Sequence, residues 1–240
     1  MQKLTISFVP QGGEVRLPLA RCAILQGLMY KLVSYDAEYS DMLHNGGSGH
    51  EVKFFCFSDL AGDTVIRDGQ FCGRGLLTWE IRSADDRLIN AAATGLRRVP
   101  EFELHGLPCA VRRLAVSSDY IIGDRCRLTM LMPLTVFDTD PETNYRTFYD
   151  PQDARFAEQV RENLRAKWEI LTGKPLMEEI SFAPADGGKG KKCVTRYKNA
   201  PYTGYYGTYT LTAPEPLLNI AYYAGLGAAN AKGFGTWELI

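Results

Sequence analysis

The glycine-rich loop at residues 225–235 places the strongest limit on the fold of this chain. Its four glycines, Gly225, Gly227, Gly233 and Gly235, form the pattern G-x-G-x5-G-x-G. Glycine has no Cβ, so it adopts positive φ at little cost and lets another backbone approach closely. The loop follows a helical pattern and runs into Thr-Trp-Glu-Leu-Ile, which is typical of a strand. Because Rossmann and P-loop glycine motifs follow a strand and open a helix, this order excludes them.

A loop of this kind can present backbone N–H groups to an anion, and Lys232 lies inside it. A phosphate suits such a loop, and several phosphates in a row indicate a nucleic-acid backbone. A long turn that joins a helix to an edge strand explains the same glycines, so the residues alone leave both interpretations open.

Composition indicates a globular protein without a strong charge bias. The net charge is −1 over 240 residues, and 45% of the residues are hydrophobic. A nucleic-acid-binding protein of this charge must concentrate its cations on one face. Six scattered cysteines without a C-x-x-C pair predict free thiols in a reducing compartment. No apolar run reaches membrane-spanning length and the first residues lack a signal-peptide pattern, so we expect a cytoplasmic protein without a membrane partner.

Strand and helix patterns occur twice in the same order along the chain. The order strand, helix, strands, helix, strand is that of a split βαβ unit, which RNA-recognition modules also use. In the first half, we predict strands over 4–9, 52–58, 64–67, 76–82, 101–104 and 109–116, and helices over 19–33, 38–43 and 84–96.

The second half repeats this order after a junction at 117–124. The sequence therefore predicts an α+β fold of two tandem ferredoxin-like (RRM-like) domains, residues 1–118 and 125–240, joined by a linker at 119–124. Here we predict strands over 126–132, 144–149, 179–183, 192–197 and 205–211, helices over 153–171 and 214–224, and a final strand after Gly235. The apolar stripe of the long helix contains Phe156, Val160, Leu164, Trp168 and Leu171.

Three residues of the first half suggest a site for RNA cleavage. Tyr30 lies opposite the apolar stripe of the first helix, among small neighbours, while His44 stands at a helix end and Lys53 at a strand start. Cleavage without a metal needs a group that takes the proton of the ribose 2′-hydroxyl, a group that protonates the leaving 5′-oxygen, and a cation for the transition state. Histidine transfers protons near neutral pH, lysine suits the electrostatic role, and tyrosine can act as a base or orient the 2′-hydroxyl. Each residue also has a purely structural explanation. His44 can cap a helix, Lys53 can be a solvated residue beside a strand, and Tyr30 can cover an interface.

Basic residues gather locally in the second half. Lys191, Lys192, Arg196 and Lys198 form a basic strand pair and, with Lys232 and the four loop glycines, are the candidates for RNA contacts. Four tyrosines interleaved with them can stack bases or pack into a core: Tyr197, Tyr202, Tyr205 and Tyr206. Histidine and carboxylate spacings typical of a metal site are absent from the sequence, and we expect no metal and no cofactor.

The chain resembles the CRISPR-associated repeat-processing endoribonucleases, the sixth Cas family, in the repeat-associated RNA-binding superfamily. The glycine-rich loop lies in the family's place, just before the C-terminus. The first-helix segment 25–30 matches the segment that bears the family's catalytic tyrosine, Leu43-His44 matches its leucine-histidine pair, and the segment 53–58 resembles its lysine with an aromatic strand.

The resemblance implies metal-independent cleavage of the repeat in a CRISPR transcript, leaving a 2′,3′-cyclic phosphate and a 5′-hydroxyl. It suggests Tyr30 as base or 2′-hydroxyl positioner, His44 as acid and Lys53 as charge stabiliser, while the choice of base between Tyr30 and His44 stays open. His50 is a second candidate for proton transfer. A catalytically silent RNA-binding subunit of a complex with other Cas proteins is the alternative. The sequence leaves the CRISPR subtype, the repeat structure and the choice between monomer and homodimer open.

Overall fold

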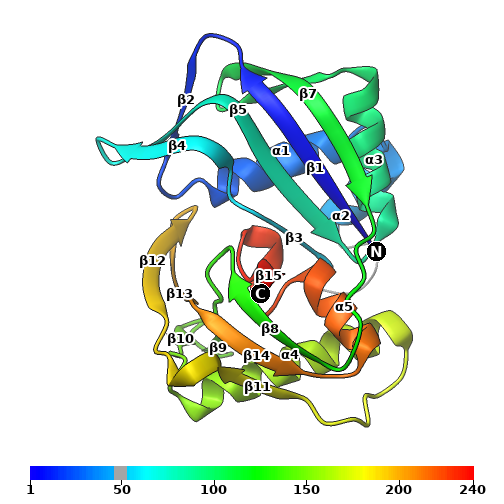
Figure 1. Ribbon diagram of the computed structural model, residues 1–240, viewed down its shortest axis with the longest axis vertical. Helices are drawn as coiled ribbons and strands as arrows, with labels where there is room; N and C mark the ends of the chain where they lie inside the picture. The colour runs from blue at the N-terminus through cyan, green and yellow to red at the C-terminus, as the bar shows by residue number, and fades with distance from the viewer. Residues whose placement is uncertain (46–52) are drawn as a thin grey trace.

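The structure, a computed structural model, describes residues 1–45 and 53–240, without the side chains of Met42, His44, Asn45 and Asp186. The chain forms two α+β halves that lie one above the other in Figure 1. None of the helices in the described part of the chain has the length and apolar composition needed to span a bilayer.

The first half is organised around strand β1 (Gln2–Pro10), whose side chains alternate between core and surface. Leu4 and Ile6 have no exposed surface, as the alternation predicts. β1 lies antiparallel between β5 (Gln70–Ser83) and β7 (Leu107–Ser117), so it is a central strand. The other elements of this half are β2 (Glu14–Pro18), α1 (Cys22–Val33), α2 (Ala37–Asn45), β3 (Phe55–Phe57), β4 (Ala61–Arg67), α3 (Asp86–Arg98) and β6 (Glu101–Leu104).

Helices α1 and α3 lie together on one face of this sheet (Figure 1). Each carries a stripe of buried residues, including Leu25 and Met29 on α1 and Leu88 and Leu96 on α3. β5 and β7 are joined through α3 and flank β1, which is the ferredoxin-like order.

Strand β2, which was not predicted, precedes the helix that was predicted from residue 19. Val15 and Leu17 are buried at alternate positions and pair with β5, so the chain is extended through Pro18 and α1 begins at Cys22. Proline ends an edge strand readily because it lacks only an N–H that the ladder does not need there. The predicted helix start was therefore wrong by one turn.

The second half contains a sheet in the order β11-β14-β8-β15, with the strands antiparallel. This is the complete four-strand order of a ferredoxin-like unit, so the predicted tandem arrangement is confirmed. The boundaries at residues 118 and 125 stay a prediction. The elements are β8 (Arg125–Met130), β9 (Phe137–Thr139), β10 (Arg146–Phe148), α4 (Ala154–Thr172), β11 (Ser181–Pro184), η1 (Ala185–Gly187), β12 (Lys191–Tyr197), β13 (Ala200–Tyr206), β14 (Thr208–Thr212), α5 (Glu215–Ala224), η2 (Asn230–Lys232) and β15 (Trp237–Leu239).

Two hairpins, β9–β10 and β12–β13, are inserted into the second half outside its main sheet. The single strand predicted over 205–211 is two strands. They are separated at Gly207, whose carbonyl accepts a hydrogen bond from the Met130 N–H at 3.0 Å. The chain thus leaves the β12–β13 hairpin and enters the main sheet within one residue.

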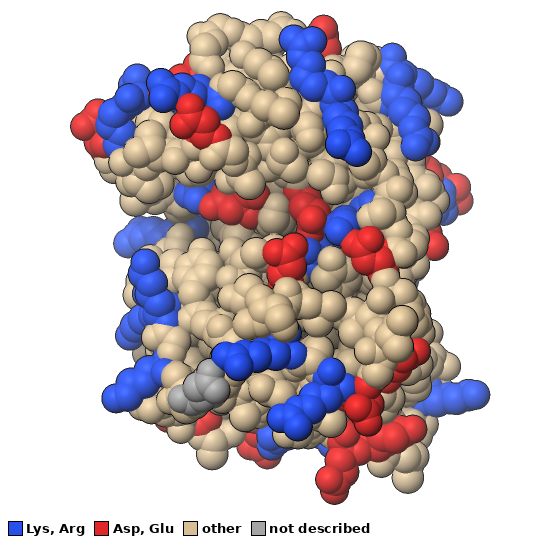
Figure 2. Space-filling model, viewed as in Figure 1, with Lys and Arg blue, Asp and Glu red and all other residues tan. Residues whose placement is uncertain are grey.

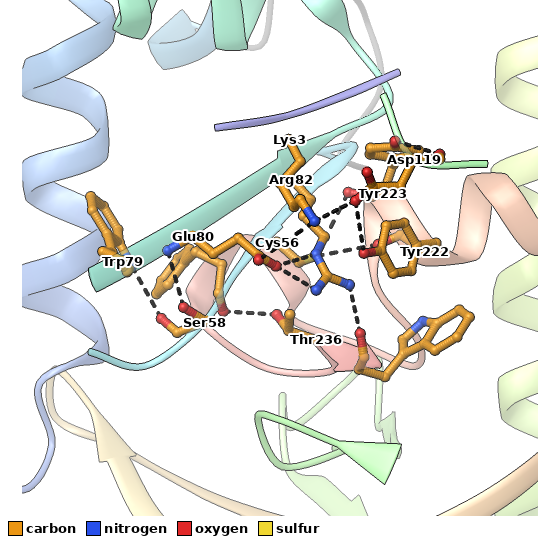
Figure 3. A network of polar contacts seen from close by, with 12 residues as sticks. Lys3, Cys56, Ser58, Trp79, Glu80, Arg82, Asp119, Tyr222, Tyr223 and Thr236 are labelled. Carbon is orange, nitrogen blue, oxygen red and sulfur yellow. Dashed lines mark hydrogen bonds and ion pairs between the residues drawn. The ribbon is translucent and has the colours of Figure 1, made fainter. Parts of the chain in front are cut away.

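The two halves are joined by a buried polar network around Arg82 of β5 (Figure 3). The Arg82 side chain is 0% exposed, and its Nη1 donates to the carbonyl of Trp237 at 2.6 Å. Its guanidinium lies 3.9 Å from the ring centroid of Tyr222 and pairs with Glu80. A buried guanidinium needs such partners because it stays charged. This network therefore ties the first sheet to α5 and β15.

Further hydrogen bonds continue this junction on both sides of Arg82. Thr236 Oγ1 donates to the carbonyl of Phe57 at 2.7 Å. The Tyr223 hydroxyl donates to the carbonyl of Asp119 at 2.6 Å, and the Asp119 carboxylate pairs with Lys3. The predicted linker is thus held at the junction by both halves (Figure 3).

We predict that Arg82→Met destabilises the protein by about 2–4 kcal/mol, because it leaves Glu80 and the Trp237 carbonyl without their buried donor. The matched control is Arg74→Met on the same strand, whose ion pair with Asp63 is exposed. That change should cost no more than about 1 kcal/mol. Denaturant unfolding measures both values, and equal effects would contradict the role of Arg82.

Candidate active site and nucleic-acid interface

A cleft of about 830 Å³ lies between the two halves. The first half contributes α1 and Lys53 to it, and the second half contributes α4, the β12–β13 turn and the centre of the glycine-rich loop. The lining residues are Ala23, Gln26, Gly27, Tyr30, Lys53, Phe137, Asn163, Lys167, Tyr197, Lys198 and residues 227–232. The small side chains around Tyr30 on α1 leave this space open, as the sequence indicated.

The structure brings Tyr30 and Lys53 together in this cleft. Lys53 Nζ donates a hydrogen bond of 2.6 Å to the Tyr30 hydroxyl oxygen and lies 4.9 Å from the ring centroid. Tyr30 lies in the last turn of α1, and Lys53 lies two residues before the start of β3. Because the ammonium donates and the phenol oxygen accepts, a cation and a hydroxyl are held side by side where a substrate can enter.

The position of the histidines is described only in part. His44 belongs to the last turn of α2, but its side chain lies outside the described residues, as does all of His50. The carbonyl of the preceding residue, Leu43, accepts a hydrogen bond from Lys53 Nζ at 3.2 Å. The chain next to His44 therefore reaches the Tyr30–Lys53 pair, and the role of His44 stays a prediction.

The four glycines of the glycine-rich loop allow close packing. All four are buried and have positive φ, between 64° and 88°. A Cβ on Gly235 would lie 2.0 Å from the Leu226 carbonyl oxygen, and one on Gly233 would lie 2.8 Å from the Phe57 ring. Two features of the fold thus require glycine here: the left-handed backbone and the contact with β3 of the other half.

Several N–H groups of the loop are used within the protein. Leu226, Ala228 and Gly235 donate to the carbonyls of Gly235, Thr135 and Pro133. The expected row of free donors is therefore not formed by these three groups. Of the four glycines, Gly227 lines the cleft. RNA contacts by Gly225, Gly227, Gly233 and Gly235 stay a prediction.

The half-buried centre of the loop faces the cleft. Lys232 Nζ donates to the Tyr202 hydroxyl at 3.0 Å and lies 5.5 Å from the ring centroids of Tyr197 and Tyr202. Gln26 of α1 donates to the Ala231 carbonyl at 2.5 Å and accepts a hydrogen bond from the Tyr197 hydroxyl. Gln26 was not predicted as a bridging residue, although it lies one turn before Tyr30 on the same face.

Lys167 is a second residue of the site that was not predicted from the sequence. Its side chain is 1% exposed, and Nζ donates to the Gly225 carbonyl at 2.6 Å and to Asn230 Oδ1 at 2.7 Å. Burial lowers its pKa to about 7. Asn230 in turn donates to the Leu226 carbonyl at 2.7 Å. Lys167 therefore holds the loop to α4.

The buried stripe of α4 shows what could have revealed Lys167. The buried residues are Phe156, Val160, Leu164 and Lys167, spaced by four, four and three positions. The predicted stripe instead ended in Trp168 and Leu171, of which Leu171 is 40% exposed. A lysine three residues after Leu164 on an apolar face is the signal of a buried cation.

The four cations of the predicted basic strand pair do not act as a group in the cleft. Lys198, in the β12–β13 turn, lines the cleft, while Lys191, Lys192 and Arg196 are exposed along β12. On the face shown in Figure 2, acidic side chains gather where the halves meet, and Lys and Arg side chains lie above and below. The cations on this face are thus dispersed. RNA contacts by the four cations of the strand pair stay a prediction.

The predicted base-stacking tyrosines are mostly core residues. Tyr202 is 1% exposed and stacks on Phe234 with 5.1 Å between ring centroids, and Tyr205 is 8% exposed. Of the two alternatives that the sequence left open for these rings, base stacking and core packing, the structure shows core packing. Tyr197 is buried but lines the cleft, and Tyr206 is half-buried.

The described residues contain no group of three His, Cys, Asp or Glu side chains that could hold a metal ion. The six cysteines are free thiols, four of them buried. Burial raises the pKa of the Cys22 thiol, which borders the loop, to about 12, so it is held as the neutral thiol.

The chain matches a known protein family in sequence. Residues 117–239, just over half of the chain, match the family model described as CRISPR associated protein Cas6, C-terminal. No curated protein sequence matches the chain.

Solved structures share the whole fold at low sequence identity. A Cas6-related protein from Pyrococcus furiosus superposes with a TM-score of 0.82 at 16% identity, covering 100% of this chain and 98% of that one. A protein titled as an RAMP protein binding different RNA substrates gives 0.83 at 17% identity, with full coverage of both chains. A product complex of the Thermus thermophilus Cas6 gives 0.73 at 16% identity, covering 100% and 99%.

We predict that Gly235→Ala destabilises the protein by at least about 3 kcal/mol, because the new Cβ meets the Leu226 carbonyl and the backbone is left-handed. Gly75→Ala is the control, since Gly75 also has positive φ but a Cβ there meets nothing within 4 Å. Gly75→Ala should cost only the about 1–2 kcal/mol that a residue with a Cβ loses in the left-handed backbone conformation. Thermal or denaturant unfolding measures the destabilisation by each variant. Equal destabilisation by Gly235→Ala and Gly75→Ala would contradict the close packing around Gly235.

We also predict that Lys167 makes stability depend on pH. Its folded pKa of about 7 lies below its ordinary value of 10.5, so between these values the unfolded chain binds the extra proton. Stability relative to Lys167→Met should therefore rise with pH above 7, by up to about 1.4 kcal/mol per pH unit. Unfolding measured from pH 6 to 9 tests this, with the exposed Lys192→Met as control.

The charge of the Cys56 thiolate opposes the effect of burial and raises the pKa of Lys167. Burial raises the pKa of the Cys56 thiol itself. Repeating the pH series in a Cys56→Ala background removes its contribution. A difference between wild type and Lys167→Met that stays flat from pH 7 to 9 would contradict the prediction.

Proposed function

The chain belongs to the Cas6 family of CRISPR-associated proteins, and from this premise we propose that it is a metal-independent endoribonuclease that cleaves CRISPR repeat RNA. One observation carries the proposal: Lys53 donates to the Tyr30 hydroxyl at 2.6 Å inside a cleft that the glycine-rich loop also lines. Of the neighbours with the same fold, one is an RAMP protein that binds different RNA substrates and one is a Cas6 product complex. These neighbours support RNA as the partner of this chain.

The proposed reaction moves two protons and exchanges one bond at phosphorus. The ribose 2′-oxygen attacks the adjacent phosphorus as its proton leaves to a base, and the bond to the 5′-oxygen breaks as an acid protonates it. The products are a 2′,3′-cyclic phosphate and a 5′-hydroxyl. Tyr30 serves as base or positions the 2′-hydroxyl, and Lys53 stabilises the extra negative charge on the phosphorus oxygens.

His44 is proposed as the acid, and His50 as the second candidate for proton transfer. Support for His44 comes from its neighbour Leu43, whose carbonyl is hydrogen-bonded to Lys53. A histidine with an ordinary pKa near 6.5 can donate and accept protons near neutral pH. The assignment of base and acid between Tyr30 and His44 stays open.

The cleft also supports the proposed RNA contacts. Lys198 and Lys232 stand on the cleft wall, and their charges attract the phosphate backbone. Lys191, Lys192 and Arg196 lie exposed along β12, beyond the cleft, where RNA that leaves it can extend. Other Cas proteins of an interference complex are proposed as further partners.

We expect the protein to cut its repeat RNA in the presence of EDTA, and to leave uncut an RNA whose 2′-hydroxyl next to the cut is replaced by hydrogen. Tyr30→Phe should lower the single-turnover rate by about 10²–10⁴-fold while RNA affinity is kept, since a proton-transfer or positioning group is lost. Tyr145→Phe, at a tyrosine 70% exposed, is the control. Gel analysis of labelled repeat RNA gives rates, and filter binding gives affinity.

Three outcomes decide between the functions. Cleavage of the deoxy substrate would remove the 2′-hydroxyl mechanism. Tight binding without product from the wild type would identify the silent RNA-binding subunit instead. Unchanged cleavage by His44→Ala would remove His44 from the mechanism.

A further inference from the structure

Two polar side chains stand on the α4 wall of the cleft and take no part in the proposed chemistry. Asn163 and Lys167 are four residues apart, so they lie on the same face of the helix one turn from each other. Both line the cleft that contains Tyr30 and Lys53. They belong to the second half of the chain, whereas Tyr30 and Lys53 belong to the first.

Asn163 has a buried acceptor without a donor. Its Oδ1 is inaccessible to solvent and has no hydrogen-bond partner among the described residues. Leaving a buried polar atom unpaired costs about 1–3 kcal/mol, and most buried side-chain polar atoms in folded proteins are paired. An apolar side chain of the same size would avoid this cost, so the amide is explained best by a donor that arrives with a ligand.

Lys167 is a buried amine whose protonated form has no counter-charge. It is 1% exposed, and its partners are two neutral oxygens, the Gly225 carbonyl and Asn230 Oδ1. No carboxylate of the described residues pairs with it. An ammonium has three donors, of which these contacts use two. An anion in the cleft would supply the missing charge and accept the third hydrogen bond.

We infer that Asn163 and Lys167 form a subsite for one ribonucleotide: both side chains turn toward the cleft when RNA enters, Lys167 binds the phosphate, and Asn163 Oδ1 accepts a hydrogen bond from that nucleotide. The donor is a hydroxyl or amino group, either the ribose 2′-hydroxyl or the exocyclic amine of the base. One helical turn separates the two side chains, a spacing comparable to that between the phosphate and the ribose of a nucleotide. Phe137 adds an aromatic side chain to the lining of the same cleft.

This subsite rests on the proposed function because it needs RNA in the cleft. It differs from the Tyr30–Lys53 pair in what it does: it selects and positions a nucleotide and transfers no proton. Binding and cleavage therefore separate the two. A variant that loses the proposed chemistry, such as Tyr30→Phe, keeps this subsite. A variant that loses the subsite, such as Asn163→Leu, keeps Tyr30 and Lys53 in place.

The deciding variant is Asn163→Leu, measured with a repeat RNA made uncleavable by one 2′-deoxy nucleotide at the cut. We expect its melting temperature to equal or exceed that of the wild type, because an unpaired buried acceptor is removed. Its RNA Kd should rise by about tenfold, the value of one lost hydrogen bond. The control is Asn90→Leu, at an exposed asparagine of α3, which should leave the Kd unchanged.

Modified RNAs identify the donor. A series with single 2′-deoxy nucleotides away from the cut, and a series with bases that lack the exocyclic amine, are each bound to wild type and to Asn163→Leu. One position should weaken wild-type binding by about tenfold and leave Asn163→Leu unaffected, as expected for two partners of one hydrogen bond. A position in the first series assigns the ribose, and one in the second assigns the base.

Lys167→Met tests the phosphate contact. Its slope of log Kd against log salt should be shallower than that of the wild type by about 0.7, the value for one phosphate contact in single-stranded RNA. Tyr30→Phe should keep the wild-type slope. Because Lys167 also holds the glycine-rich loop, Asn163→Leu decides the inference if Lys167→Met fails to fold.

A folded Asn163→Leu that binds every RNA as tightly as the wild type overturns the subsite, while cleavage by the wild type continues to support the endoribonuclease. Failure of the wild type to bind repeat RNA overturns the proposed function and, with it, the subsite.

Discussion

The close approach of the glycine-rich loop to both halves of the molecule is the constraint on which the rest of the structure depends. Gly233 lies against Phe57 of the first half, and Gly235 lies against the Leu226 carbonyl within the loop. Any Cβ at these positions would push the loop away from β3 or open the turn. The loop thus sets how far apart the halves stand, and with that the width of the cleft between them.

Polar groups that are buried at this junction hold the arrangement in one geometry. Arg82 reaches from the first sheet to the backbone of β15, and Lys167 reaches from α4 to the start and the centre of the loop. Gln26 connects α1 to the loop a single turn from Tyr30. A buried charge tolerates few positions of its partners, so the Tyr30–Lys53 pair and the loop are held at fixed positions relative to each other. Such positioning is what catalysis by proton transfer requires.

Much of the local structure could be predicted from the sequence, and the failures have physical causes. The alternation of Leu4 and Ile6 and the spacing of Leu25 and Met29 indicate which face of each element is buried. The tandem order and most of the predicted strands and helices were therefore confirmed. The break at Gly207 was missed because two consecutive strands in different sheets carry the same period-two pattern as one strand. β2 was missed because Pro18 is compatible with the end of a strand and the start of a helix.

Some features of the candidate site follow from the sequence, and others depend on the tertiary structure. The sequence by itself determined the residue types and their elements: the tyrosine on the open face of α1, the lysine before β3 and the glycines that must adopt positive φ. Tertiary structure decided which of them meet, because a distance of 2.6 Å between Lys53 and Tyr30 depends on how two elements pack. It also decided that Tyr202 is covered, that Lys198 joins the cleft, and that Lys167 is buried. Hydrophobic pattern records which face turns inward, but the partner of a buried polar atom comes from a distant part of the chain and leaves no local pattern.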